Sequence, residues 1–137
     1  MKLYNISSDE GLPSDIINFV YQDSEGFLWM ASTEGLIRWD GYNYRSYRHS
    51  ESNMYSISNN IVYHIYEDAG NRLWVTTING LNLYDREMDR FEKVKIHDTL
   101  HDIPVNDILE DAEGHLWLGT SYGLCRYDHE DGSYEWW

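Results

Sequence analysis

The stretch that decides the fold is DAEGHLWLGT at residues 111–120, which is followed by Gly-Leu at 123–124 and Tyr-Asp at 127–128. The same unit occurs twice more, beginning with DSEGFLW at 23–29 and with DAGNRLW at 68–74. In each copy the Trp follows the Asp at a spacing of six residues, and the three tryptophans lie 45 and then 43 residues apart. A self-similar period of this size is typical of a repeat protein.

Each copy has the residues of a β-hairpin turn followed by a short strand. Asp23 and Asp111 have a glycine three residues later, which suits a type I turn in which the Asp side chain accepts backbone N–H groups and the glycine takes a positive φ. The second copy has Gly70-Asn71 here, so the special residue moves by one. Neighbouring residues of the Leu-Trp strand are both apolar, which predicts a sheet that is buried on both faces. This strand is expected to end at Thr33, Thr77 and Thr120 in the three copies.

Four short strands in each unit of about 43 residues, with both sheet faces covered, predict one blade of a β-propeller. The expected strands are 16–22, 27–33, 36–40 and 44–48, then 61–67, 72–77, 81–85 and 90–95, then 104–110, 115–120, 124–128 and 133–137. A helical repeat stays open as an alternative, because residues 16–21 have apolar side chains at helical spacing. The third copy favours strands, since its matching segment is short, contains Pro104 and is rich in β-branched residues.

The predicted fold is therefore all-β, with three four-stranded antiparallel blades of an incomplete propeller. We expect one domain over residues 1–137, with blades at about 11–48, 57–95 and 102–137 and with 1–10 as a strand of a neighbouring blade. Six repeated residues are expected to be structural, as tryptophans between blades or as turn glycines: Trp29, Trp74, Trp117, Gly35, Gly80 and Gly123.

The pattern Asp-x-x-Gly-x-Leu-Trp-x-Gly-Thr, then Gly-Leu and Tyr-Asp, resembles the two component regulator propeller repeat over residues 10–137. Ala31 and Thr76, which stand where the third copy has Gly119, are departures from it. Such repeats form the extracytoplasmic sensor region of hybrid two-component systems in Bacteroidetes-type bacteria. The resemblance implies a periplasmic, non-catalytic segment of a histidine kinase parent that senses a glycan-derived or other small extracellular ligand, such as an oligosaccharide.

Composition excludes several classes of partner. Ten basic against 24 acidic residues give a net charge of −14, which repels phosphate backbones, so we expect no binding of nucleic acid. No apolar run approaches the roughly 18 residues that suggest a transmembrane helix, so no membrane insertion of this segment is expected. The first six residues are too short and polar for a signal peptide. Cys125 is the single cysteine, and a packed thiol is expected in preference to a nucleophile.

Polar loop residues at one rim of the propeller are the candidates for ligand binding. Loops between second and third strands, and loops before first strands, gather on a single face around the channel. The rim candidates are Asp15, Glu34, Asn60, Asn79 and Tyr122. An ordinary role as exposed turn residues stays open for each of them.

No metal or cofactor is expected. His97 and His101 have a spacing that suits a metal on a helix, but no third ligand is placed beside them, and a polar loop is the plainer interpretation. The Asp-rich turns at 23–25, 68 and 111–113, and the run at 128–132, lack the alternating ligand pattern of a calcium loop.

Three functional hypotheses follow, which are a ligand-binding module, a scaffold that binds another protein through blade edges, and a propeller lyase or hydrolase. Three blades cannot close a ring, so the first and last blades should each leave an apolar face uncovered, bearing Trp29-type and Trp117-type side chains or their neighbours. The remaining blades of a longer parent, or self-association, would cover these faces.

Overall fold

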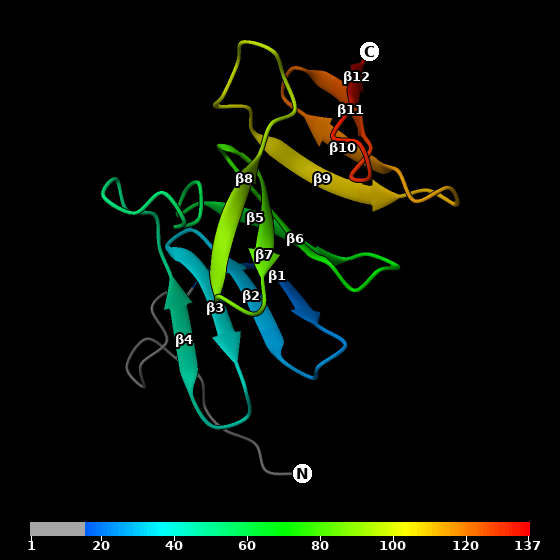
Figure 1. Ribbon diagram of the computed structural model, residues 1–137. Helices are drawn as coiled ribbons and strands as arrows, with labels where there is room; N and C mark the ends of the chain where they lie inside the picture. The colour runs from blue at the N-terminus through cyan, green and yellow to red at the C-terminus, as the bar shows by residue number, and fades with distance from the viewer. Residues whose placement is uncertain (1–15) are drawn as a thin grey trace.

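The structure, a computed structural model, describes residues 16–137 (Figure 1). The described residues form three four-stranded antiparallel sheets and contain no helix. The first sheet contains β1 (Ile17–Gln22), β2 (Leu28–Ser32), β3 (Gly35–Trp39) and β4 (Tyr44–Tyr47). The second contains β5 (Val62–Glu67), β6 (Leu73–Thr77), β7 (Gly80–Asp85) and β8 (Arg90–Val94). The third contains β9 (Val105–Glu110), β10 (Leu116–Thr120), β11 (Gly123–Tyr127) and β12 (Tyr134–Trp136).

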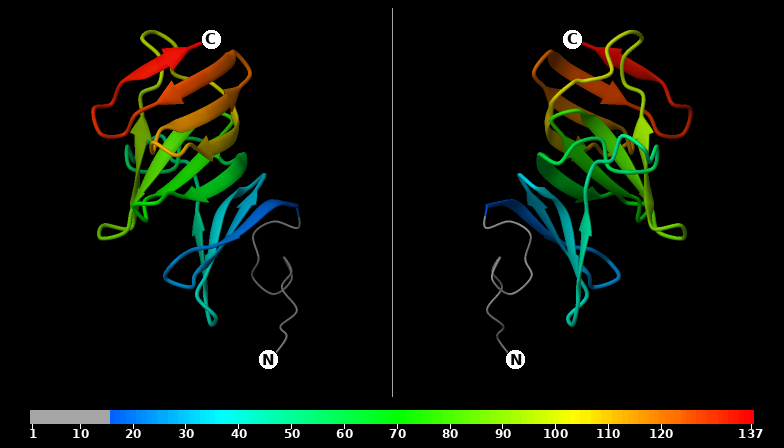
Figure 2. Two further views of the ribbon diagram at one scale, coloured as in Figure 1. Left: turned by 90° about the vertical axis from the view of Figure 1, so that its right-hand side faces the viewer. Right: turned by 90° about the vertical axis from the view of Figure 1, so that its left-hand side faces the viewer.

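The sheets lie side by side in chain order, as the blades of a propeller do (Figures 1 and 2). In each sheet the strands follow one another as neighbours, and the first strands β1, β5 and β9 contact one another in sequence. The all-β prediction of three four-stranded blades is confirmed, and the helical alternative for residues 16–21 is wrong because β1 pairs with β2 over this segment. One detail also differs, since β2 ends at Ser32, which takes the place predicted for Thr33.

Each Asp of the repeat joins its turn to its tryptophan. The Oδ1 atom of Asp68 accepts the backbone N–H groups of Gly70 and Arg72 at 2.9 Å each, and its Oδ2 atom accepts the indole Nε1–H of Trp74 at 2.8 Å. Asn71 has a φ of 63°, which is the positive value expected at the shifted position. The same indole bonds run from Trp29 to Asp23 at 2.7 Å and from Trp117 to Asp111 at 2.8 Å.

Two apolar cores fill the spaces between the blades. Trp29 is fully buried among side chains of the first two sheets, where the edge of its ring meets Tyr84. Trp74 is fully buried between the second and third sheets, where it meets the edge of Tyr127. Each of these tryptophans therefore faces the next blade in the chain and receives a tyrosine from that blade's third strand.

The carboxylate of Asp89, in the turn between β7 and β8, joins the first two blades. The Oδ1 atom of Asp89 accepts the hydroxyls of Tyr47, from the first blade, and Tyr84, from the second, at 2.6 Å each. Arg45 of the first blade reaches Oδ2 at 2.6 Å. Burial opposes the charge of Asp89, but these donors outweigh it and lower the pKa of Asp89.

Only the third blade leaves its tryptophan face open among the described residues. Trp117 is half-buried and packs on Trp137, which is 60% exposed, and the neighbouring Leu109 and Leu124 are 63% and 41% exposed. Trp29 itself is not on an open face, because it points toward the second blade and is 0% exposed, whereas Val20 of the same blade is 53% exposed.

The repeated tryptophan should dominate the stability of the blades. We expect Trp74→Ala to lower the free energy of unfolding by about 3–5 kcal/mol, the usual cost of emptying a large aromatic site. Trp137→Ala should cost much less, because most of that side chain is already in water. Chemical denaturation of both variants is the measurement, and equal midpoints would contradict the assignment of Trp74 to the core.

The turn carboxylates should make the fold sensitive to acid. Burial raises the pKa of Asp68, but the donors Trp74 and Arg72 outweigh this effect and lower it. A lowered pKa stabilises the fold above the unfolded value of about 4, and this stabilisation is lost as the pH falls through the folded value. The melting temperature should therefore fall as the pH drops below about 5. Asp68→Asn should be less stable at neutral pH and should lose less on acidification, whereas the exposed control Glu87→Gln should follow the unsubstituted chain.

The open face should promote self-association. An exposed apolar patch of several hundred Å² drives contact between soluble proteins, and screening over about 10 Å at 0.1 M salt limits the repulsion from the acidic charge. We expect sedimentation equilibrium at micromolar concentrations to show dimers or larger species. Leu109→Lys should shift the protein toward monomer, and Tyr42→Lys, at a distant exposed turn, should not. A well-folded chain that is monomeric at every concentration would contradict this expectation.

Candidate ligand-binding site

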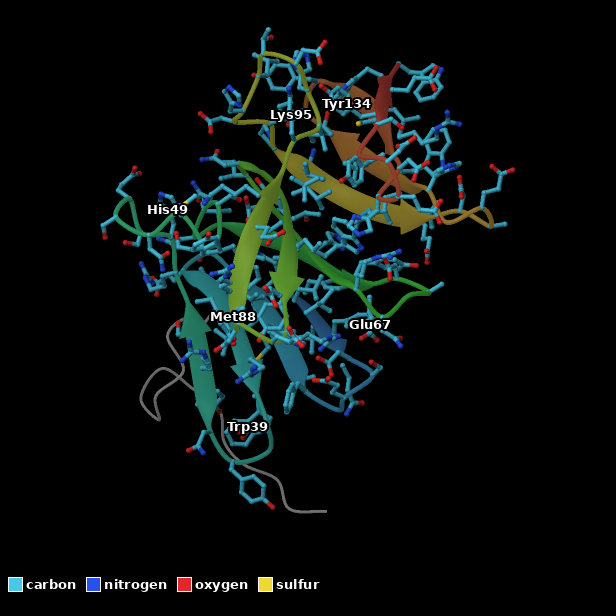
Figure 3. The ribbon with its side chains drawn as sticks, viewed as in Figure 1. Trp39, His49, Glu67, Met88, Lys95 and Tyr134 are labelled. Carbon is cyan, nitrogen blue, oxygen red and sulfur yellow. The ribbon has the colours of Figure 1, made fainter. Side chains whose placement is uncertain are left out.

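The two connections between blades lie at the same ends of the sheets as the turn between β6 and β7 (Figure 1). Residues 48–61 lead from β4 to β5, and residues 95–104 lead from β8 to β9. A hollow of about 460 Å³ opens between these connections, above the start of β7. Its polar lining includes His49, Asn79, Lys93, Lys95, His101 and Asp102. Figure 3 labels His49 and Lys95, which come from the first and second connections.

The first connection is held by hydrogen bonds beside the hollow. The Nζ atom of Lys93 donates to the carbonyls of Met54 and Ser56 at 3.1 Å each. The side-chain oxygen of Asn60 accepts the backbone N–H of His49 at 2.7 Å. Lys93 therefore ties the first connection to β8, and Asn60 ties its beginning to its end. These bonds fix one wall of the hollow.

The ring of His49 lies between two acceptors. Its Nδ1 atom is 2.9 Å from the carbonyl of Ile57, and its Nε2 atom is 3.0 Å from a carboxylate oxygen of Glu51. Because both partners can only accept, both bonds form together when the ring carries two protons and a positive charge. The Glu51 hydrogen bond accordingly raises the pKa of His49.

A buried polar network lies beside the hollow. The side-chain amide of Asn82 accepts the backbone N–H of Ser58 at 3.1 Å and donates to the Ser58 hydroxyl at 2.8 Å. That hydroxyl also bonds the hydroxyl of Thr77 at 2.7 Å. Ile37 and Cys125 occupy the matching positions in the other blades, so this network belongs to the second blade alone among the described residues.

The structure gathers the predicted rim residues only in part. Asn79 lines the hollow and Asn60 braces its wall. Glu34 is exposed in the turn between β2 and β3, and Tyr122 is 61% exposed at the turn of the third blade. Asp15 lies outside the described residues. The hollow thus draws on one blade and the two connections that flank it.

Sequence reasoning missed His49, Lys93 and Lys95 as lining residues. A signal was present, because the chain has three lysines and two of them stand at 93 and 95. Alternate residues of an extended chain point to the same side, so Lys93 in β8 and Lys95 just after its end should have side chains on one side. What the sequence could not indicate is that the two connections come together over this strand.

Other candidate sites have structural partners. The Nδ1 atom of His97 accepts the backbone N–H groups of Thr99 and Leu100, which makes it a turn residue of the second connection. No group of three or more His, Cys, Asp or Glu residues within 16–137 is placed to hold a metal ion. Burial raises the pKa of the Cys125 thiol to about 11. No helix in the described part of the chain is long and apolar enough to cross a membrane.

The chain matches the family described as two component regulator propeller in three segments, at residues 11–34, 56–79 and 99–122. These segments together include more than half of the chain. Each contains one copy of the Asp-to-Trp unit and the turn that follows it. No curated protein sequence matches the chain.

Solved structures with the same arrangement include proteins of three bacteria. The extracellular domain of a protein described as a hybrid two component system from B. thetaiotaomicron is 26% identical, with a TM-score of 0.83. The match covers 98% of this chain and 20% of that domain, so the chain spans about a fifth of its length. PorZ, a surface component of the type-IX secretion system of Porphyromonas gingivalis, is 13% identical with a TM-score of 0.70, covering 88% of this chain and 21% of PorZ. A catalytically inactive virginiamycin B lyase from Staphylococcus aureus, solved with quinupristin, is 12% identical with a TM-score of 0.61, covering 85% of this chain and 39% of the lyase.

Proposed function

The chain belongs to the two component regulator propeller family, and from this premise we propose that it is part of the ligand-sensing region of a hybrid two-component sensor. The observation that carries the proposal is the likeness to the extracellular domain of such a system over 98% of the chain. The segment would lie in the periplasm, would be non-catalytic, and would belong to a parent with further blades and a histidine kinase. Its ligand would be a glycan-derived or other small extracellular molecule.

The hollow supplies a physical route from binding to signalling. Its walls come from the connections on either side of the second blade. A ligand that contacts both connections would therefore link the second blade to its two neighbours. Such a ligand can shift the equilibrium between two arrangements of the blades only if it binds one arrangement more tightly than the other. The size of the shift equals the difference between the two binding free energies. Lys93 is well placed for this, because it already ties β8 to the first connection.

A protein-binding scaffold and a lyase or hydrolase are the two alternative functions, and each would give a different experimental result. A scaffold would bind another protein and show no response to small molecules. A lyase or hydrolase would turn over a substrate. The fold that the chain shares with virginiamycin B lyase carries no chemistry by itself, because one fold hosts many functions.

A panel of mono- and oligosaccharides, tested by thermal shift with turnover assayed in parallel, separates these functions. We expect at least one member to raise the melting temperature in a saturable way, because a ligand that binds only the folded chain stabilises it. The same member should be recovered unchanged after prolonged incubation. Conversion into products would favour an enzyme, and a flat response to the whole panel would remove the support for a sensor of small glycans.

A further inference from the structure

The charge lining the hollow sets it apart from the rest of this acidic chain. Six of the seven described arginines form an ion pair with a carboxylate. The two described lysines, Lys93 and Lys95, form none, and both line the hollow. Lys93 uses two of its ammonium protons on the carbonyls of the first connection, so one remains. Lys95 is exposed and has no hydrogen bond or ion pair with any residue in 16–137.

The acidic residues of the lining leave this positive charge available. Glu51 holds the ring of His49, and its own side chain is 95% exposed. Asp102 is exposed on the opposite connection. A carboxylate in this place can accept hydrogen bonds from hydroxyl groups, as can the side-chain oxygen of Asn79.

The rest of the lining limits the body of the ligand. The hollow of about 460 Å³ falls at the small end of the ~300–1,000 Å³ typical of sites for small molecules. Its floor is aliphatic, with Leu81, Val94, Ile96 and Ile103. No Trp, Tyr or Phe lines it, so it has no stacking platform for the flat face of a long neutral glycan.

We propose that the hollow binds a small hydroxylated carboxylate, of the size of a one- or two-ring sugar acid. The ligand's carboxylate lies at Lys95 and the remaining proton of Lys93, and its hydroxyls donate to Asp102 and Asn79. The inference rests on the proposed sensing function and adds to it the charge of the ligand and the place where it binds.

The test is an NMR titration of the ¹⁵N-labelled 137-residue chain with sodium glucuronate and, as the neutral counterpart, glucose. Glucuronate should give saturable amide shifts in residues 49–58, 79–81 and 93–103, which line the hollow, and its affinity should fall as salt screens the lysines. Glucose should bind at least about tenfold more weakly, because it lacks the charge-assisted hydrogen bonds.

Variants assign the effect to the lysine. Lys95→Gln should weaken glucuronate binding about tenfold, because it removes one charge-assisted contact. The side chain of Lys95 has no partner to lose among the described residues, so the melting temperature of the Lys95→Gln variant should equal that of the unsubstituted chain. Arg126→Gln, on the third blade away from the hollow, removes the same charge and should leave the affinity unchanged.

Three outcomes would overturn the inference. Equal affinity for glucose and glucuronate at the hollow would show that charge is not read, and sensing of a small glycan would stand. Saturable shifts confined to residues outside 49–58, 79–81 and 93–103 would show that the ligand binds elsewhere, and sensing would again stand. No saturable shift with glucuronate at millimolar concentration would remove the sugar-acid assignment, while the saccharide panel tests the sensing function separately.

Discussion

One carboxylate in each repeat carries both the turn and the core. Asp68 satisfies two backbone amides with one oxygen and the indole of Trp74 with the other, so the hairpin cannot open without leaving a buried polar group unpaired. The tryptophan in turn fills the space between two blades. The spacing of six residues from Asp to Trp is therefore the distance along the chain that lets one side chain reach both the turn and the ring.

The Asp turn also presents groups to the next blade. Glu67, at the end of β5, accepts the N–H and hydroxyl of Ser24, which follows the turn Asp of the first blade. Glu110, at the end of β9, accepts the N–H of Ala69 in the same way. Folding of a turn and docking of its neighbour thus share a few atoms, which makes adjacent blades cooperate in a structure whose contacts are otherwise between neighbours only.

Much of the fold could be predicted because the repeat is local. The spacing of Asp, Gly and Trp indicates the hairpin and the buried strand, and the shifted Gly70-Asn71 follows the same turn chemistry. The sequence does not predict which neighbouring blade Trp29 faces. Both faces of its strand are apolar, so the pattern does not distinguish them. The site was predicted in part, through Asn79. Its lysines and His49 come together through two connections of irregular structure, whose path depends on individual bonds such as that from Lys93 to Met54.

The buried amide of Asn82 has a consequence for the first connection, because its partner Ser58 lies in that segment. An irregular segment has no strand pairing to fix its course, so single side-chain bonds decide it. Ile37, Asn82 and Cys125 occupy one equivalent place, but only Asn82 needs the hydroxyl of Ser58 from the segment just before its own blade. If the first connection took another path, the Asn82 side-chain oxygen would lose the Ser58 N–H and stay buried without that partner, at a cost of about 1–3 kcal/mol. Asn82 therefore specifies the path by which the chain enters the middle blade.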